Sequence, residues 1–222
     1  MSIQIQGYGG VVAEVDGSVY RALRVTLRPV DYGSLGQYRC SLLSGTMAAG
    51  LGAASQVFQV RWTSTPQLAL IWGVSIDGLS GSATTFTAGF ALFNLVVARS
   101  WTADGTGGST ATLTGNNQKL RTSMGTSLMG TIRIASTAAL GAGTSTLDGQ
   151  SEGQISFSIG TTANVNYLLQ TGLYGASSLE DGGNPAPIVL AQNEGVVARA
   201  TVPATGTWQF GMTVAWSEVA SY

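Results

Sequence analysis

The stretch that decides the fold is Thr207–Val219, which reads TWQFGMTVAWSEV near the end of the chain. Large apolar side chains occupy every second position, and small or polar ones fill the positions between them. The apolar set is Trp208, Phe210, Met212, Val214 and Trp216. Because side chains along a strand point alternately to opposite faces, this pattern predicts a β-strand with one face in a buried core.

Two shorter runs precede this strand. Residues 187–190 and 195–202 are rich in Val, Ile and Ala, and segments containing Asn, Pro and Gly separate the three runs. These are the composition and punctuation of short strands joined by turns. We therefore expect the three strands to pair as an antiparallel meander.

A second alternating set lies in residues 68–76. Its large members are Leu68, Leu70, Trp72, Val74 and Ile76. We expect this strand to face the same core, with Trp72 and Trp216 buried on opposing surfaces. Trp62 and Trp208 also occupy alternating apolar registers, so we predict that they belong to the core.

Residues 86–101 form the longest apolar run. Both of its faces carry large side chains, and its β-branched and aromatic content favours a long central strand. A buried helix is the alternative, because periodicity does not separate the two structures in a continuously apolar run.

Turn signals divide the rest of the chain. Asp16-Gly17 predicts a hairpin near the N-terminus, whose second strand ends before Pro29. Residues 44–55 are broken by glycines and predict a loop with at most one helical turn, and residues 137–148 predict a loop of small residues.

These patterns predict about ten to twelve strands and no well-supported helix. The fold class is therefore all-β, an antiparallel β-sandwich with jelly-roll-like connections and long Gly/Ser/Thr-rich loops. An elongated barrel is the alternative. A chain of 222 residues can form one such domain, residues 1–222, with a substantial core.

The composition indicates a weakly charged surface. Only 9% of residues are charged, against roughly 25% in an average soluble protein. The formal net charge is -1. Such a surface repels other copies weakly, which favours a subunit of a larger assembly over a thermally tolerant secreted domain.

The sequence lacks the residue types that several kinds of catalytic and metal site require. The chain has no His and a single cysteine, Cys40, so it can build neither a Ser-His-Asp triad nor an internal disulfide nor a cysteine zinc site. Most carboxylates precede Gly in turns, although Glu152, Glu194 and Glu218 could supply a glycosidase pair. We predict no enzyme, with no catalytic, cofactor or metal site.

Other ligand classes also find little support. Calcium held by loop carboxylates such as Glu180 and Asp181 is an alternative, although two acids fall short of a full oxygen cage. No apolar run reaches the about 18 residues of a membrane span, and no signal peptide is visible. The densest basic group is Arg21, Arg24 and Arg28, which is no cluster. We therefore expect folding in a reducing cytosol, with no membrane and no nucleic acid as partner.

Residues 102–130 have a different composition, dominated by Gly, Ser, Thr and Asn. The segment is too long for an ordinary connection, so it predicts a functional loop, an arm, or a region ordered by a partner. Its large residues, with the flanking Trp101, are the candidate subunit interface: Trp101, Leu113, Leu120, Met124, Leu128 and Met129. Trp101 could instead be core, or be exposed for stacking on a sugar.

Parts of the chain resemble a known group of proteins. Residues 187–190, 193–197 and 207–218, together with 133–140 and 146–148, are similar to small accessory virion proteins encoded near the head and tail genes of tailed bacteriophages. This resemblance implies a β-rich structural subunit, such as a capsid decoration or minor head protein, in a symmetric oligomer.

We therefore expect a virion structural protein that binds the outside of a phage head. Its partners would be further copies of itself, as a homo-oligomer and most simply a trimer, and other virion proteins such as the major capsid protein. It would be assembled in the host cytoplasm and reside in the virion. The alternative is a receptor- or glycan-binding module at a tail or fibre.

Overall fold

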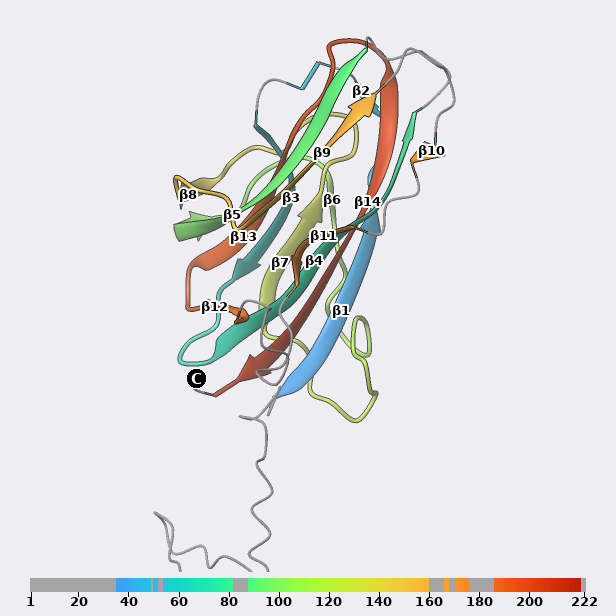
Figure 1. The fold of residues 1–222 in the computed structure, drawn as a ribbon. Coiled ribbons are helices and arrows are strands. Elements are labelled where there is room, and N and C mark those ends of the chain that lie inside the picture. The colour runs from blue at the N-terminus through green and yellow to red at the C-terminus, as the bar shows by residue number, and fades with distance from the viewer. Residues whose placement is uncertain are drawn as a thin grey trace, which may run out of the picture. The chain divides into compact units, whose positions relative to one another are not determined.

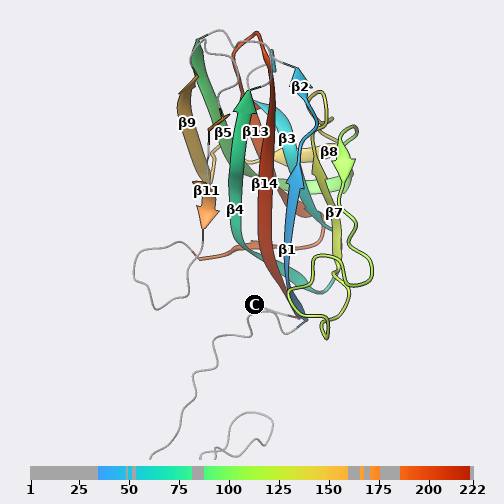
Figure 2. The same cartoon turned by 90° about the vertical axis from the view of Figure 1, so that its right-hand side faces the viewer.

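The structure, a computed structural model, describes residues 35–48, 50–51, 54–81, 88–159, 166–167, 171–175 and 186–220. Within these ranges every regular element is a β-strand, and the strands form two antiparallel sheets that pack against each other (Figures 1 and 2). The predicted antiparallel β-sandwich is confirmed, and the barrel alternative is wrong. The jelly-roll-like connection remains a prediction.

The first sheet is built around the C-terminal strand. Its order is β1 (Gly36–Leu43), β14 (Thr207–Val219), β4 (Leu68–Gly81) and β10 (Asn166–Tyr167). Three short strands complete it: β2 (Met47–Ala48) pairs with β14, while β11 (Thr171–Gly175) and β12 (Ile188–Leu190) pair with β4.

The second sheet covers the inner face of the first. Its order is β6 (Ser109–Thr110), β7 (Met129–Ile134), β3 (Ser55–Trp62), β13 (Glu194–Thr201), β5 (Gly89–Ala103) and β8 (Thr144–Leu147). Strand β9 (Gly153–Ile159) also pairs with β5.

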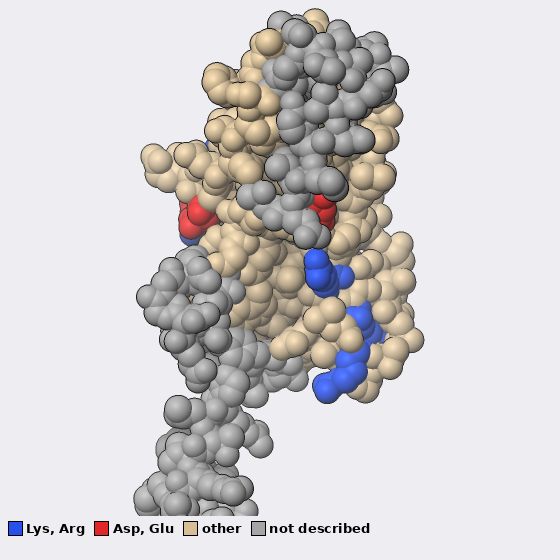
Figure 3. All heavy atoms as spheres, turned by 45° about the vertical axis from the view of Figure 1, so that its right-hand side comes forward, with Lys and Arg blue, Asp and Glu red and all other residues tan. Residues whose placement is uncertain are grey.

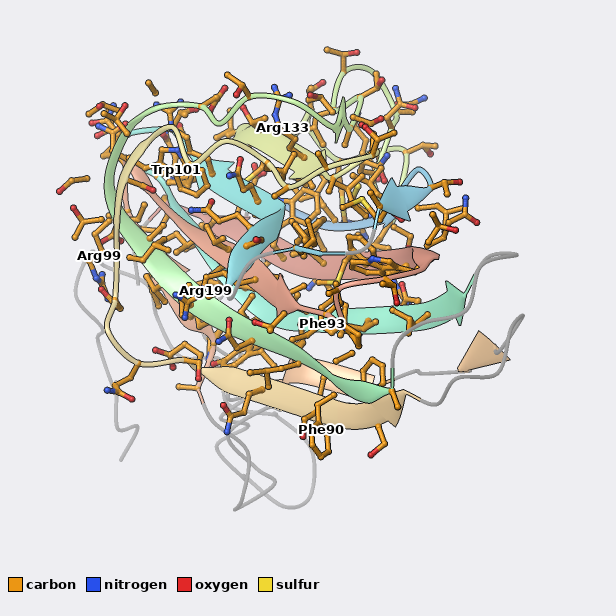
Figure 4. The ribbon with its side chains drawn as sticks, turned by 90° about the horizontal axis from the view of Figure 1, so that it is seen from above. Phe90, Phe93, Arg99, Trp101, Arg133 and Arg199 are labelled. Atoms are coloured by element: carbon orange, nitrogen blue, oxygen red, sulfur yellow. The ribbon has the colours of Figure 1, made fainter. Side chains whose placement is uncertain are left out.

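The core between the sheets contains all five large side chains predicted from β14. Across the sheets, the ring of Phe93 lies 6.0 Å from that of Trp208 and 5.9 Å from that of Phe210. Figure 4 shows Phe93 between the two layers. Trp216 stacks on Tyr38 of β1, with 5.4 Å between ring centroids. Trp62 is in the same core, as predicted.

The predicted meander is wrong. Strand β13 pairs with β3 and β5 in the second sheet, whereas β12 and β14 both pair with β4 in the first. The chain therefore crosses the sandwich on each side of β13. A short connection can close a hairpin or step between sheets, and the turn residues do not distinguish these outcomes.

The predicted alternation of β4 is wrong in its first half. Ala215 pairs with Gly73 and Trp216 with Ile71, so Trp72 is an extra residue in a β-bulge. The bulge reverses the phase, so Ala69 and Ile71 enter the core between the sheets in place of Leu68, Leu70 and Trp72. Leu70 is nevertheless buried, outside that core. Trp72 is half-buried, and its Nε1 donates to Ser217 Oγ at 2.6 Å. The expected packing of Trp72 opposite Trp216 is therefore also wrong.

Other predictions have mixed outcomes. Strand β5 confirms the strand interpretation of residues 86–101 over most of its length, so the helix alternative is wrong. Strands β2 and β8 lie where loops were predicted, because their partners β14 and β5 supply backbone bonds that local composition does not reveal. The hairpin at Asp16-Gly17 and the acids Glu180 and Asp181 lie outside the described residues.

We predict that Trp216→Ala lowers the free energy of unfolding by about 3–5 kcal/mol, because it empties a large site in the core. The matched control is Trp72→Ala on the neighbouring strand, whose half-buried side chain should cost distinctly less. Urea titrations of both variants measure the difference. Equal shifts would contradict the bulge in β4.

Cys40 provides a second test of the core. Its side chain is fully buried in β1, and burial raises the pKa of the thiol to about 11. We expect the native protein not to react with an aromatic disulfide reagent at pH 7, and to react with one equivalent after unfolding in urea. Rapid reaction of the native protein would show that β1 opens easily.

Candidate interaction surface

The segment of residues 102–130 begins at the end of β5, directly after Trp101, which is buried within this chain. Its ring lies against Gly195 of β13, where a Cβ atom would stand 2.8 Å from the ring carbons. Its indole Nε1 donates to Ala103 O at 3.0 Å. Trp101 is therefore a packing residue on the outer face of the second sheet, and it is not available to stack on a sugar.

An ion pair and its hydrogen bonds hold the start of the segment, just after Trp101, against the second sheet. Arg61 of β3 donates through Nε to Trp101 O at 2.9 Å and forms an ion pair with Asp104 at 2.6 Å. Thr131 Oγ1 donates to the other oxygen of the same carboxylate at 2.8 Å. These bonds hold the pKa of Asp104 below its ordinary value, although burial opposes them. The start of the segment is therefore tied to β3 and β7.

The segment then follows the edge of the second sheet. Strand β6 pairs with β7, and Ala111 N donates to Ile132 O at 2.9 Å just beyond it. Gly108 precedes β6 with a φ of 65° and stands against the carbonyl of Ile134, so a side chain would fit neither the conformation nor the space. Leu113 packs on the core from this side.

Farther along, the segment reaches the edge of the first sheet. Arg39 N donates to Gln118 O at 3.0 Å, and Leu120 N donates to Gln37 O at 3.2 Å. An antiparallel bridge between Tyr38 and Lys119 lies between these two bonds. The segment thus runs from the edge strand β7 to the edge strand β1 and satisfies backbone groups on both.

Glu218, near the end of β14, holds the last part of the segment. Its carboxylate accepts hydrogen bonds from Ser127 Oγ at 2.6 Å, from Leu128 N at 3.0 Å and from Trp216 Nε1 at 3.1 Å. The side chain is fully buried, and no described Lys or Arg forms an ion pair with it. Burial raises the pKa of Glu218, while these donors oppose the shift.

Tyr38 adds a further attachment beside Glu218. Its hydroxyl donates to Gly125 O at 3.0 Å, and Gln37 N donates to Met124 Sδ at 3.2 Å. Burial, and then the negative charge of Glu218, raise the pKa of Tyr38 to about 12. The hydroxyl therefore stays protonated and keeps its role as a donor at neutral pH.

The predicted interface residues have different environments. Trp101 and Met129 are buried, and Leu113 and Met124 are half-buried. Leu120 and Leu128 have exposed fractions of 60% and 40%. Only these two of the six side chains are exposed to a partner. No ordering by another chain is needed to place the segment, because its own β1, β7 and β14 hold it.

Two further groups, missed by the sequence analysis, lie on the same side. Leu35 is 37% exposed, and its N donates to Glu218 O at 3.0 Å. Arg39 and Arg121 are both exposed. Arg39 N donates to Gln118 O, two residues before Leu120, and Arg121 follows Leu120 in sequence. We call Leu35, Arg39, Leu120, Arg121 and Leu128 the leucine–arginine face. Isolated leucines in Gly- and Ser-rich sequence gave no signal of this grouping.

The carboxylates considered for catalysis lie in separate elements. Glu218 is buried under the segment, Glu194 pairs with Arg99 at 2.7 Å, and Glu152 is exposed before β9. No three His, Cys, Asp or Glu side chains in the described ranges gather as a metal site. The same ranges contain no helix long and apolar enough to cross a membrane.

Comparisons with known proteins find no matching family model, no matching curated protein and no matching solved structure.

Glu218 gives a pH test of this attachment. Its pKa is higher in the folded than in the unfolded chain, so its contribution to stability is complete below the ordinary value of 4.5 and is lost as the pH rises through the raised value. Glu218→Gln stays neutral throughout. We therefore expect this variant to gain stability relative to the wild type as the pH rises above 4.5.

Urea unfolding of both proteins at several pH values measures this gain. Hydrogen exchange at the Leu128 amide gives a local readout, because that N–H donates to the Glu218 carboxylate. A stability difference that stays constant with pH would contradict the proposed environment of Glu218.

Proposed function

We propose that this chain is a virion structural protein, a capsid decoration or minor capsid subunit that binds a phage head through its leucine–arginine face. The observation that carries the proposal is the attachment of residues 102–130 along β1, β7 and β14. A segment rich in Gly, Ser and Thr would lose much conformational entropy on binding a partner. Here its own chain already holds it in place.

The exposed leucines support a docking role for this surface. Of the five large hydrophobic side chains exposed in the described residues, Leu35, Leu120 and Leu128 belong to the leucine–arginine face. Apolar side chains gathered on a rigid, weakly charged surface are typical of protein–protein contacts. The resemblance of the sequence to accessory virion proteins supports the assignment of the partner to a phage particle.

We further propose that the subunits form homo-oligomers, most simply trimers, both in solution and on the particle. The small net charge of -1 supports this proposal, because it produces little repulsion between copies. Light scattering on the purified protein tests it directly, and a strictly monomeric protein at high concentration would reject it.

Labelling of purified phage particles with an antibody to this protein tests the proposed location. We expect many copies over the head. Leu120→Ser and Leu128→Ser should each weaken attachment about tenfold, the result of losing roughly 1.4 kcal/mol at a buried apolar anchor. Quantitative mass spectrometry of particles assembled with each variant gives the copy number.

Phe90→Ser is the matched control, because Phe90 is a large apolar side chain with an exposed fraction of 72% on another strand. It should leave the copy number unchanged. Particles without this protein would overturn the proposal, and so would leucine variants that attach as well as the wild type.

Phe90 also supports a second candidate, a receptor- or glycan-binding module. It lies on the outer side of β5, as Figure 4 shows, opposite Ser158 of β9 and two residues from the half-buried Leu92. An exposed aromatic ring beside hydroxyl groups suits a sugar. Labelling confined to the tail, with attachment to host cells lost in Phe90→Ser, would favour this candidate.

A further inference from the structure

We propose that the partner surface bound by the leucine–arginine face is an acidic protein surface. This inference rests on the proposed docking role of that face and adds the chemistry of its partner. Figure 3 shows basic side chains gathered on this side of the molecule, with an acidic side chain beside the uppermost of them.

Backbone contacts bring the basic residues together from two parts of the chain. Arg39 lies on β1, and Lys119 and Arg121 lie on the segment that bonds to β1 on either side of the Tyr38–Lys119 bridge. Lys119 Nζ donates to Asn116 Oδ1 at 3.3 Å, while Arg39 and Arg121 are exposed. The sequence separates these cations by about eighty residues, which is why no basic cluster is visible in it.

The two arginines have no carboxylate partner among the described residues. The ion pairs in these ranges are Arg61 with Asp104, and Arg99 with Asp148 and Glu194. Glu218 of the neighbouring strand β14 is buried under the segment. The nearby outer face of the first sheet carries Asp77, which accepts hydrogen bonds from Ser75 and Thr213. Within the described part of the chain, the leucine–arginine face therefore carries positive charge that no ion pair neutralises.

The combination of basic and leucine side chains favours a protein over a nucleic acid as the partner. A nucleic acid is bound by larger sets of cations, with aromatic side chains for stacking where the strand is single. This face has three exposed leucines, Leu35, Leu120 and Leu128, in addition to its cations, and the nearby Tyr38 and Trp216 rings are buried. Apolar anchors with a charged rim are the composition of a protein interface, in which complementary charge increases the rate of association.

Retention on immobilised poly-L-glutamate at pH 7 tests the inference with a defined acidic probe. The whole chain has a net charge of -1, so any retention requires a local basic surface. We expect binding in 50 mM NaCl that is lost at high salt. Arg39→Glu and Arg121→Glu should each weaken it about 3- to 10-fold, with unchanged unfolding midpoints.

Arg199→Glu is the control for net charge. It also replaces a positive charge by a negative one, but on the outer face of the second sheet, where Arg199 Nε donates to Asn94 Oδ1 at 3.1 Å. We expect retention equal to that of the wild type. No retention of the wild type, retention independent of salt, or equal weakening by Arg199→Glu would each overturn the inference. Tighter binding of a thirty-residue thymidine oligonucleotide, lost in Arg121→Glu, would overturn it in favour of nucleic acid.

The retention experiment and the particle labelling test the two proposals independently. If Leu120→Ser removes the protein from particles but poly-L-glutamate does not retain the wild type, the docking role stands and the inference of an acidic partner surface is wrong. If retention follows the arginines but the particles lack the protein, the charge inference stands and the virion role is wrong.

Discussion

The structure depends on the packing of one strand, β14, which pairs with β1 on one edge and with β4 on the other. Its inner side chains fill the space between the two sheets, and Phe93 of β5 packs against two of them. Its end carries Glu218, which bonds to residues 127 and 128 of the long segment. The same strand therefore determines both the core and the position of the candidate interaction surface.

The buried carboxylate of Glu218 is the second constraint. A charged group without a cation is costly to bury unless several donors reach it. Ser127, Leu128 and Trp216 supply those donors, two of them from the segment that has to be held. Detaching the segment would remove two of these three donors and leave the carboxylate with the Trp216 indole alone. This mutual dependence allows a Gly-rich chain to keep a defined course, although each of its glycines lowers local rigidity.

The exposed surfaces differ in what they can recognise. The leucine–arginine face combines apolar side chains with arginines that form no ion pair with any described carboxylate, on β1 and on a segment held at both sheet edges. The surface around Phe90 combines an aromatic ring with serines on a regular sheet. The first suits the surface of another protein and the second suits a sugar, so the two candidate functions depend on separate parts of the molecule and can be tested separately.

The sequence by itself determined the fold class, because alternating side chains specify which face of a strand is buried. The five apolar residues of β14 and the strand character of β5 could be predicted in this way. The phase of β4 could not, since the bulge at Trp72 depends on its pairing with β14. The sheet that receives β13 depends likewise on packing across the sandwich.

The candidate surface was predicted only in part. Composition identified residues 102–130 as unusual and selected Leu120 and Leu128, but it also selected Trp101 and Met129, which are buried. Only the tertiary structure joined Arg39 to Gln118 of the segment that carries Arg121, and placed the donors of the segment on Glu218. The physical reason is that these contacts join residues far apart in the chain, and a local pattern carries no record of which distant backbone or carboxylate will meet it.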